Sequence, residues 1–198
     1  MSIPILHSDD PLGDPAVGAV RDRLRGGGLT VGGEADVRAA VSAVIADVEA
    51  RGDAAVAELT ARIEKIELGP ERFRVSAEEL AAARQQADAD LLAAVGRAAD
   101  NVRAYQQSIL IPTPPPIRRG GRELRVRYTP VDRVGVFVPG GSGSGAVLVS
   151  TMVMTIVPAQ VAGVGRIAVI SPPTADGDVS SAVLAVAAEL GADEVYRV

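Results

Sequence analysis

The feature that most constrains the fold is a pattern of strand, glycine-rich turn, helix and strand between Val131 and Pro173. Residues 133–138 are β-branched and aromatic and too few for a helix, whereas residues 146–164 are long enough for one. Residues 166–170 are apolar again. This order is half of a parallel α/β unit. The stretch therefore predicts an α/β fold with the first half of a Rossmann-like parallel sheet.

The glycine-rich turn is the main candidate for binding chemistry. Gly141, Gly143 and Ala146 have the G-x-G-x-x-A spacing of a dinucleotide-binding turn. The nucleotide ribose usually meets an acid about 20 residues further on. Here the second strand ends in Ser-Pro-Pro at 171–173, and the next acid, Asp176, is expected to open a helix. A flexible connector, or a site for another phosphorylated small molecule, would have the same spacing.

The residues before this stretch indicate helices. Ser76 and Glu79 form a capping-box pattern at the start of a long helix. Three apolar stripes at helical spacing are expected to face the core: Val37, Val41, Val44, Ile45 and Val48; Val56, Leu59, Ile63 and Ile66; and Leu91, Val95, Ala98, Val102 and Tyr105.

A proline-rich segment, IPTPPP at 111–116, separates these helices from an alternating strand at 123–129. Five arginines lie nearby without interleaved aromatic residues, which favours a solvated hairpin over a nucleic-acid site: Arg118, Arg119, Arg122, Arg125 and Arg127. We predict two domains, a helical region with a hairpin at 1–130 and an incomplete Rossmann-like unit at 131–198.

Composition excludes several classes of function. A net charge of −5 gives no electrostatic reason to bind nucleic acid or an anionic membrane. Polar residues interrupt the uncharged stretch 145–165, so we expect a packed helix there and not a membrane span. The chain has no cysteine and one histidine, His7. We therefore predict no catalytic residue and no metal ligand in this chain, and a cytoplasmic location.

Several segments together resemble the histidinol dehydrogenase family. They are RVGVFVPGG, VPAQVAGVGRIAVISPP, DVEARGDAAVAELTARIEKIEL and VSAEELAAARQQADADLLAAVGRAADNVRAY. The similarity is collinear from about Val37 onward. In the family, GADEVYRV is followed by a Gly-Gly-Ala-Gln segment and more than half of the enzyme, so the chain resembles the N-terminal portion.

The resemblance implies an NAD-dependent enzyme of histidine biosynthesis. The family oxidises L-histidinol to L-histidine in two hydride transfers, with a histidine as general base and a glutamate that helps to activate water. Zinc, held by Gln, His, Asp and His side chains, anchors the substrate. In the family, the zinc ligands, the general base and the glutamate all lie downstream of the position that corresponds to Val198 of this chain. The family works as a homodimer whose active site draws on both subunits.

Five residues of this chain match the family's NAD-contacting turn: Phe137, Pro139, Gly140, Gly141 and Ser142. Phe137 stands where the family has a tyrosine, so the ring is kept and the hydroxyl is lost. Ile63 replaces a phenylalanine that the family commonly has near the cofactor. These two departures favour an alternative function, a non-catalytic binding or assembly module that keeps the fold.

Overall fold

The structure, a computed structural model, describes residues 9, 13–25, 34–139 and 148–198. It divides into two compact units, Met1–Gly52 and Asp53–Val198. The first unit contains α1 (Pro15–Arg25) and α2 (Glu34–Arg51). The division into 1–130 and 131–198 stays a prediction.

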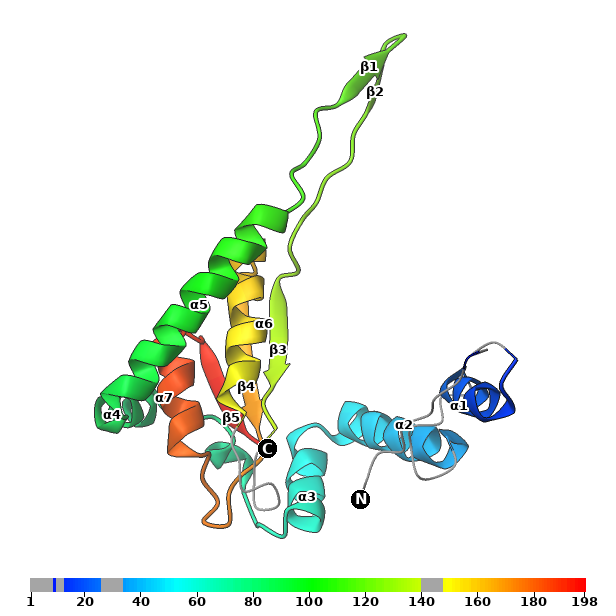
Figure 1. Ribbon diagram of the computed structural model, residues 1–198. Coiled ribbons are helices and arrows are strands. Elements are labelled where there is room, and N and C mark those ends of the chain that lie inside the picture. The colour runs from blue at the N-terminus through cyan, green and yellow to red at the C-terminus, as the bar shows by residue number, and fades with distance from the viewer. Residues whose placement is uncertain (1–8, 10–12, 26–33, 140–147) are drawn as a thin grey trace. The chain divides into compact units, whose positions relative to one another are not determined.

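The second unit holds the sheet and its covering helices (Figure 1). In chain order its elements are α3 (Asp53–Ile63), η1 (Pro70–Arg72), α4 (Ala77–Gln86), α5 (Ala89–Ile109), β1 (Ile117–Arg119), β2 (Arg122–Leu124), β3 (Arg133–Phe137), α6 (Val149–Ala162), β4 (Arg166–Ser171), α7 (Ser181–Glu189) and β5 (Glu194–Arg197).

The predicted α/β class is confirmed by a parallel sheet with the strand order β3-β4-β5. Val136 of β3 lies opposite Val169 of β4, which lies opposite Val195 of β5. All three valines are buried, as β-branched side chains on the covered face of a parallel sheet should be.

The core lies between this sheet and its helices. Helices α6 and α7 connect successive strands, α5 packs against α6, and α4 packs against α7 (Figure 1). From α6, Met152 and Ile156 are fully buried, and Val95 of α5 joins the same cluster. The core is thus built mainly from aliphatic side chains of the α/β half.

The prediction of one long helix after Ser76 is wrong, because the chain forms α4 and α5 with a break between them. Asp88 starts the second helix, since its carboxylate accepts a hydrogen bond from the backbone N–H of Asp90 at 2.8 Å. The capping box itself is confirmed: Glu79 N–H donates to Ser76 Oγ at 3.1 Å, and Ser76 N–H donates to Glu79 Oε2 at 2.8 Å.

Parts of the predicted apolar stripes are not buried. Val37, Val41 and Ile45 on α2 are exposed, as are Ile63 on α3 and Tyr105 on α5. Helical spacing specifies that apolar side chains share a face, but burial also needs an element that covers that face. The prediction that all three stripes belong to the core is therefore wrong at these residues.

Residues 111–130, which we call the arm, connect α5 to β3 and extend away from them (Figure 1). The arm ends in the antiparallel hairpin of β1 and β2, in which Ile117 lies opposite Leu124. The predicted strand at 123–129 is wrong in length, because pairing stops at Leu124. Every arm residue is exposed, as expected for a solvated hairpin.

Among the described residues, the structure contains no helix both long and apolar enough to cross a bilayer. The uncharged stretch expected to pack as a helix contributes α6, which has 14 residues and buries Met152, Val153, Ile156 and Val157.

Candidate functional site

The carboxyl ends of the three parallel strands form one edge of the sheet. Val138 N–H donates to the Ile170 carbonyl at 2.8 Å, and Val198 N–H donates to the Ser171 carbonyl at 3.2 Å. These bonds align the end of β3, from which the glycine-rich segment leaves, with the ends of β4 and β5. In open α/β sheets ligands bind at this edge.

Phe137 lies at this edge on the face opposite α6. Its neighbours Val136 and Val138 are buried, and side chains alternate along a strand, so the Phe137 ring points to the other face. The ring is 60% exposed, which makes it an accessible aromatic surface and not a packed core residue. Gly135, on the same face, adds no side chain, and a Cβ there would meet Ile170 Cδ1 at 3.4 Å.

The other residues predicted to bind the cofactor follow Phe137 after one intervening residue, Val138. Pro139 is half-buried at the end of β3. Gly140, Gly141 and Ser142 lie outside the described residues, as does His7. The structure thus places Phe137 and Pro139 at the edge where a nucleotide would bind in this class of sheet.

The turn after β4 holds Asp176, which sequence analysis expected to open the next helix. That expectation is wrong, because α7 begins at Ser181. Asp176 instead accepts a hydrogen bond from the Thr174 hydroxyl, and this bond lowers the pKa of its carboxyl. Thr174 N–H also donates to the Asp178 carbonyl at 2.7 Å, so the segment closes as a tight turn.

Arg197, which sequence analysis did not single out, is buried beside this turn. One of its terminal nitrogens, Nη1, donates to Asp178 Oδ1 and the other, Nη2, to Glu79 Oε1, each at 2.6 Å. The arginine therefore ties the end of β5 to the turn after β4 and to the start of α4. An arginine in an alternating strand gives no sequence signal for such a role, since its partners lie 19 and 118 residues away.

A second polar cluster lies on the face of the sheet that also carries Phe137, opposite α6. Glu194 is 7% exposed; its carboxylate accepts from Tyr196 Oη at 3.0 Å and from Arg166 Nη2 at 3.3 Å. Burial, and then the hydrogen bond and charge of Glu194, raise the pKa of Tyr196. A cavity of about 350 Å³ adjoins this cluster and is lined also by Phe73 and Arg133.

The described residues bring together no group of three or more histidine, cysteine, aspartate or glutamate side chains that would hold a metal ion. They also place no histidine near the candidate edge, so the part of the chain in view supplies no imidazole for proton transfer. What the described edge offers is an exposed aromatic ring beside the backbone of a parallel sheet.

The parallel strand order β3-β4-β5, with α6 and α7 as the crossover helices, defines an α/β protein built on a parallel sheet. The profile of the family described as "Histidinol dehydrogenase" matches residues 31–198. The chain belongs to the histidinol dehydrogenase family.

Individual relatives agree with this assignment. The histidinol dehydrogenase of Ruegeria pomeroyi is 44% identical over 163 residues, covering 82% of this chain and 37% of that protein. The enzyme of Geobacillus kaustophilus is 39% identical over 181 residues, covering 89% of this chain and 42% of that protein. The chain thus spans about two fifths of the length of these relatives.

A solved structure shows the same fold. The crystal structure of histidinol dehydrogenase from Elizabethkingia anophelis superposes with a TM-score of 0.73 at 29% identity. The match covers 85% of this chain and 38% of that one. The family assignment supports an oxidoreductase ancestry in histidine biosynthesis.

Proposed function

We propose that this chain provides the NAD-binding portion of a zinc-assisted histidinol dehydrogenase that converts L-histidinol to L-histidine. The observation that carries the proposal is the exposed ring of Phe137 at the carboxyl end of β3, within a segment matched by the family profile. NAD, when bound, accepts the hydride in each of the two oxidation steps.

The described residues fit a planar cofactor at this edge. Phe137 offers a ring for stacking or edge contact, which favours aromatic partners. Gly135 adds no side chain to the adjoining face of the sheet, where Ile170 Cδ1 lies 3.4 Å from the position that a Cβ would take. Pro139, Gly140, Gly141 and Ser142 are proposed to complete the contact through the turn that follows.

The same residues do not fit zinc, because the described part of the chain has no cluster of ligating side chains. We assign the zinc ligands and the catalytic base to the part of a histidinol dehydrogenase that this chain does not match. The chain's own role is then to bind and orient NAD, in a cytoplasmic homodimer. None of its residues is proposed to transfer a proton.

Titration of NAD into the full chain by calorimetry tests this role. We expect measurable binding that weakens about three- to tenfold in Phe137→Ala, since an aromatic contact contributes about 1 kcal/mol. Phe137→Tyr, which restores the family's phenol, should bind NAD at least as tightly as the unchanged chain.

Tyr105→Ala is the matched control, because Tyr105 is equally exposed but lies on α5. It should leave NAD binding unchanged. Absence of any binding heat, or equal affinities for Phe137→Ala and Tyr105→Ala, would overturn the proposal. Either result would favour the alternative, a non-catalytic module that keeps the fold.

A further inference from the structure

Two arginines stand side by side at the amino ends of the parallel strands. Arg133 of β3 lies opposite Arg166 of β4 in the register of the sheet. Like charges on neighbouring strands repel each other. Arg166 has a counterion, because its Nη2 lies 3.3 Å from Glu194 Oε1. Among the described residues, no carboxylate lies within ion-pair distance of Arg133.

Glu194 is already bound to other groups. Its carboxylate also accepts from Tyr196 Oη at 3.0 Å and lies 3.7 Å from Arg74 Nη2. Burial, and then Glu194, raise the pKa of Tyr196, whereas the charges of Arg74 and Arg133 lower it, so both cations act on the same hydroxyl. One buried carboxylate thus faces three arginines, and the cluster has an excess of positive charge.

The cavity beside this cluster combines the excess cations with apolar walls. Its volume is about 350 Å³, and Arg74, Arg133 and Tyr196 line it together with four apolar side chains: Val56, Phe73, Ala168 and Ile170. Sites for small molecules usually have such apolar walls and a few polar groups, in cavities of about 300 Å³ or more.

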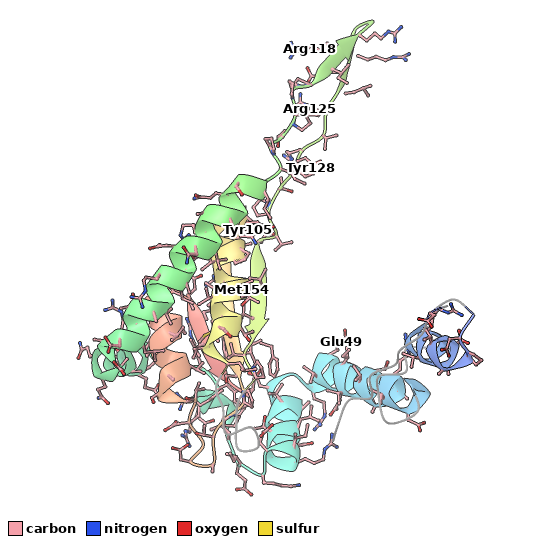
Figure 2. All side chains as sticks on the ribbon, viewed as in Figure 1. Glu49, Tyr105, Arg118, Arg125, Tyr128 and Met154 are labelled. Atoms are coloured by element: carbon pink, nitrogen blue, oxygen red, sulfur yellow. The ribbon has the colours of Figure 1, made fainter. Side chains whose placement is uncertain are left out.

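The cavity lies on the face of the sheet that α6 does not cover. Helices α5 and α6, which carry Tyr105 and Met154, pack on the other face (Figure 2). Phe137 does not line the cavity, although Ile170, which lies opposite Phe137 in the sheet, does. A ligand in this cavity therefore does not need NAD at Phe137.

We infer that this cavity binds a small organic carboxylate with an apolar body. The carboxylate pairs with Arg133, for which the described residues offer no counterion, and the apolar body lies against Phe73 and Ile170. Arginine suits this task because its planar guanidinium can hold a carboxylate with two parallel hydrogen bonds. An inorganic anion would leave the apolar walls in contact with water, so an organic ligand fits better.

Asp53 of α3 also lines the cavity and refines the class of ligand. A second positive group on the ligand, such as the ammonium group of an amino acid, would pair with its carboxylate. Two probes separate these cases: 3-phenylpropanoate has the ring and the carboxylate, and L-phenylalanine has both and an ammonium group. Asp53→Asn should weaken binding of L-phenylalanine alone if the natural ligand is an amino acid, and of neither probe if it is a simple carboxylate.

Titration of 3-phenylpropanoate into the full chain without NAD, followed by heteronuclear NMR, tests the inference. We expect a dissociation constant of about 1 mM, as is usual for a ligand of about eleven non-hydrogen atoms. The amide shifts should concentrate at residues 168–170 and 194–196. Arg133→Gln should weaken binding about three- to tenfold, a modest factor because Arg133 is exposed to solvent.

Ala168→Val tests the cavity without removing a charge. Valine suits a strand and adds methyl groups to the cavity wall, so binding should weaken about tenfold or more. Arg97→Gln is the matched control for Arg133→Gln, because Arg97 is equally an exposed arginine but lies on α5, beyond the other face of the sheet. It should leave binding unchanged.

Three results would overturn the inference. The first is the absence of saturable shifts at probe concentrations well above about 1 mM. The second is an equal loss of affinity in Arg133→Gln and Arg97→Gln, which would mean that the probe responds only to net charge. The third is phenethylamine, which has the ring but no carboxylate, binding as tightly as 3-phenylpropanoate. A failure to bind NAD in the calorimetric test would leave these readouts unaffected.

Discussion

Arg197 shows how much one side chain can hold together in this fold. It is 4% exposed, and its two hydrogen bonds of 2.6 Å reach Asp178 and Glu79. Glu79 at the same time accepts from Ser76 N–H in the capping box. A buried arginine needs such partners, because an unpaired charge in a protein interior is strongly destabilising.

This arrangement predicts how Glu79 affects stability with pH. The hydrogen bond from Ser76 N–H, together with Arg197, holds the pKa of Glu79 below its ordinary value. A carboxyl whose pKa is lower in the folded state stabilises the protein above its unfolded pKa, and that stability disappears as pH falls through the folded pKa. Glu79→Gln should therefore lower the free energy of unfolding at pH 7 by less than about 1 kcal/mol, because solvent screens this partly exposed pair.

The difference between Glu79→Gln and the unchanged chain should shrink as the pH falls through the lowered pKa of Glu79, because the carboxyl then becomes protonated. Urea unfolding at several pH values measures it. Glu78→Gln is the control, because Glu78 lies in the same first turn of α4 and is exposed. A difference that stays constant with pH would contradict this explanation.

At the scale of elements, the stability of α6 depends on the turn that closes its C-terminal end. Gly163 has a φ of 82° in the left-handed region, and Val164 N–H donates back to the Ala159 carbonyl at 3.0 Å. This closing turn lets the chain reverse into β4 within a few residues. A Cβ at Gly163 would meet only Pro130 Cγ, at 3.8 Å, so a substitution there costs backbone strain and not space.

Gly163→Ala should therefore reduce the free energy of unfolding by about 1 kcal/mol. Gly96, in the middle of α5, is the opposite case, since a Cβ there meets nothing within 4 Å and its φ is not positive. Gly96→Ala should raise stability by about 0.5–1 kcal/mol, because alanine is the better helix former. Urea denaturation of both variants measures whether the free energy of unfolding falls in Gly163→Ala and rises in Gly96→Ala. A loss of stability in Gly96→Ala would contradict the explanation from helix propensity.

At the scale of the whole molecule, the hydrophobic core belongs to one unit. The core cluster of the described residues runs from Val75 to Val195, within the unit Asp53–Val198. A segment that contains its own core can in principle fold alone.

We therefore predict that residues 53–198 expressed alone unfold in one cooperative thermal transition. Its midpoint should lie within about 5 °C of that of the full chain, because a loss of about 1 kcal/mol shifts the midpoint of a domain of this size by a few degrees. Circular dichroism during heating measures this. A gradual loss of signal without a transition would mean that the first unit is needed for folding.

The sequence by itself determined the strands of the sheet, the helix between β3 and β4, the capping box at Ser76 and the family. Those features are local: a β-branched run, a helical length or a pair of residues three apart is written into neighbouring positions. Phe137 could be chosen as a site residue from the family resemblance, since it directly precedes the Val-Pro-Gly-Gly turn.

Only the tertiary structure decided which faces are covered. It left Tyr105 and most of the stripe on α2 exposed, and it brought Arg197 to Glu79 across 118 residues. It also covered the edge of β5, whereas no strand among the described residues covers that of β3. Burial and edge pairing depend on which distant segment arrives at a surface. That outcome is set by the packing of the whole unit, because no local pattern specifies the partner.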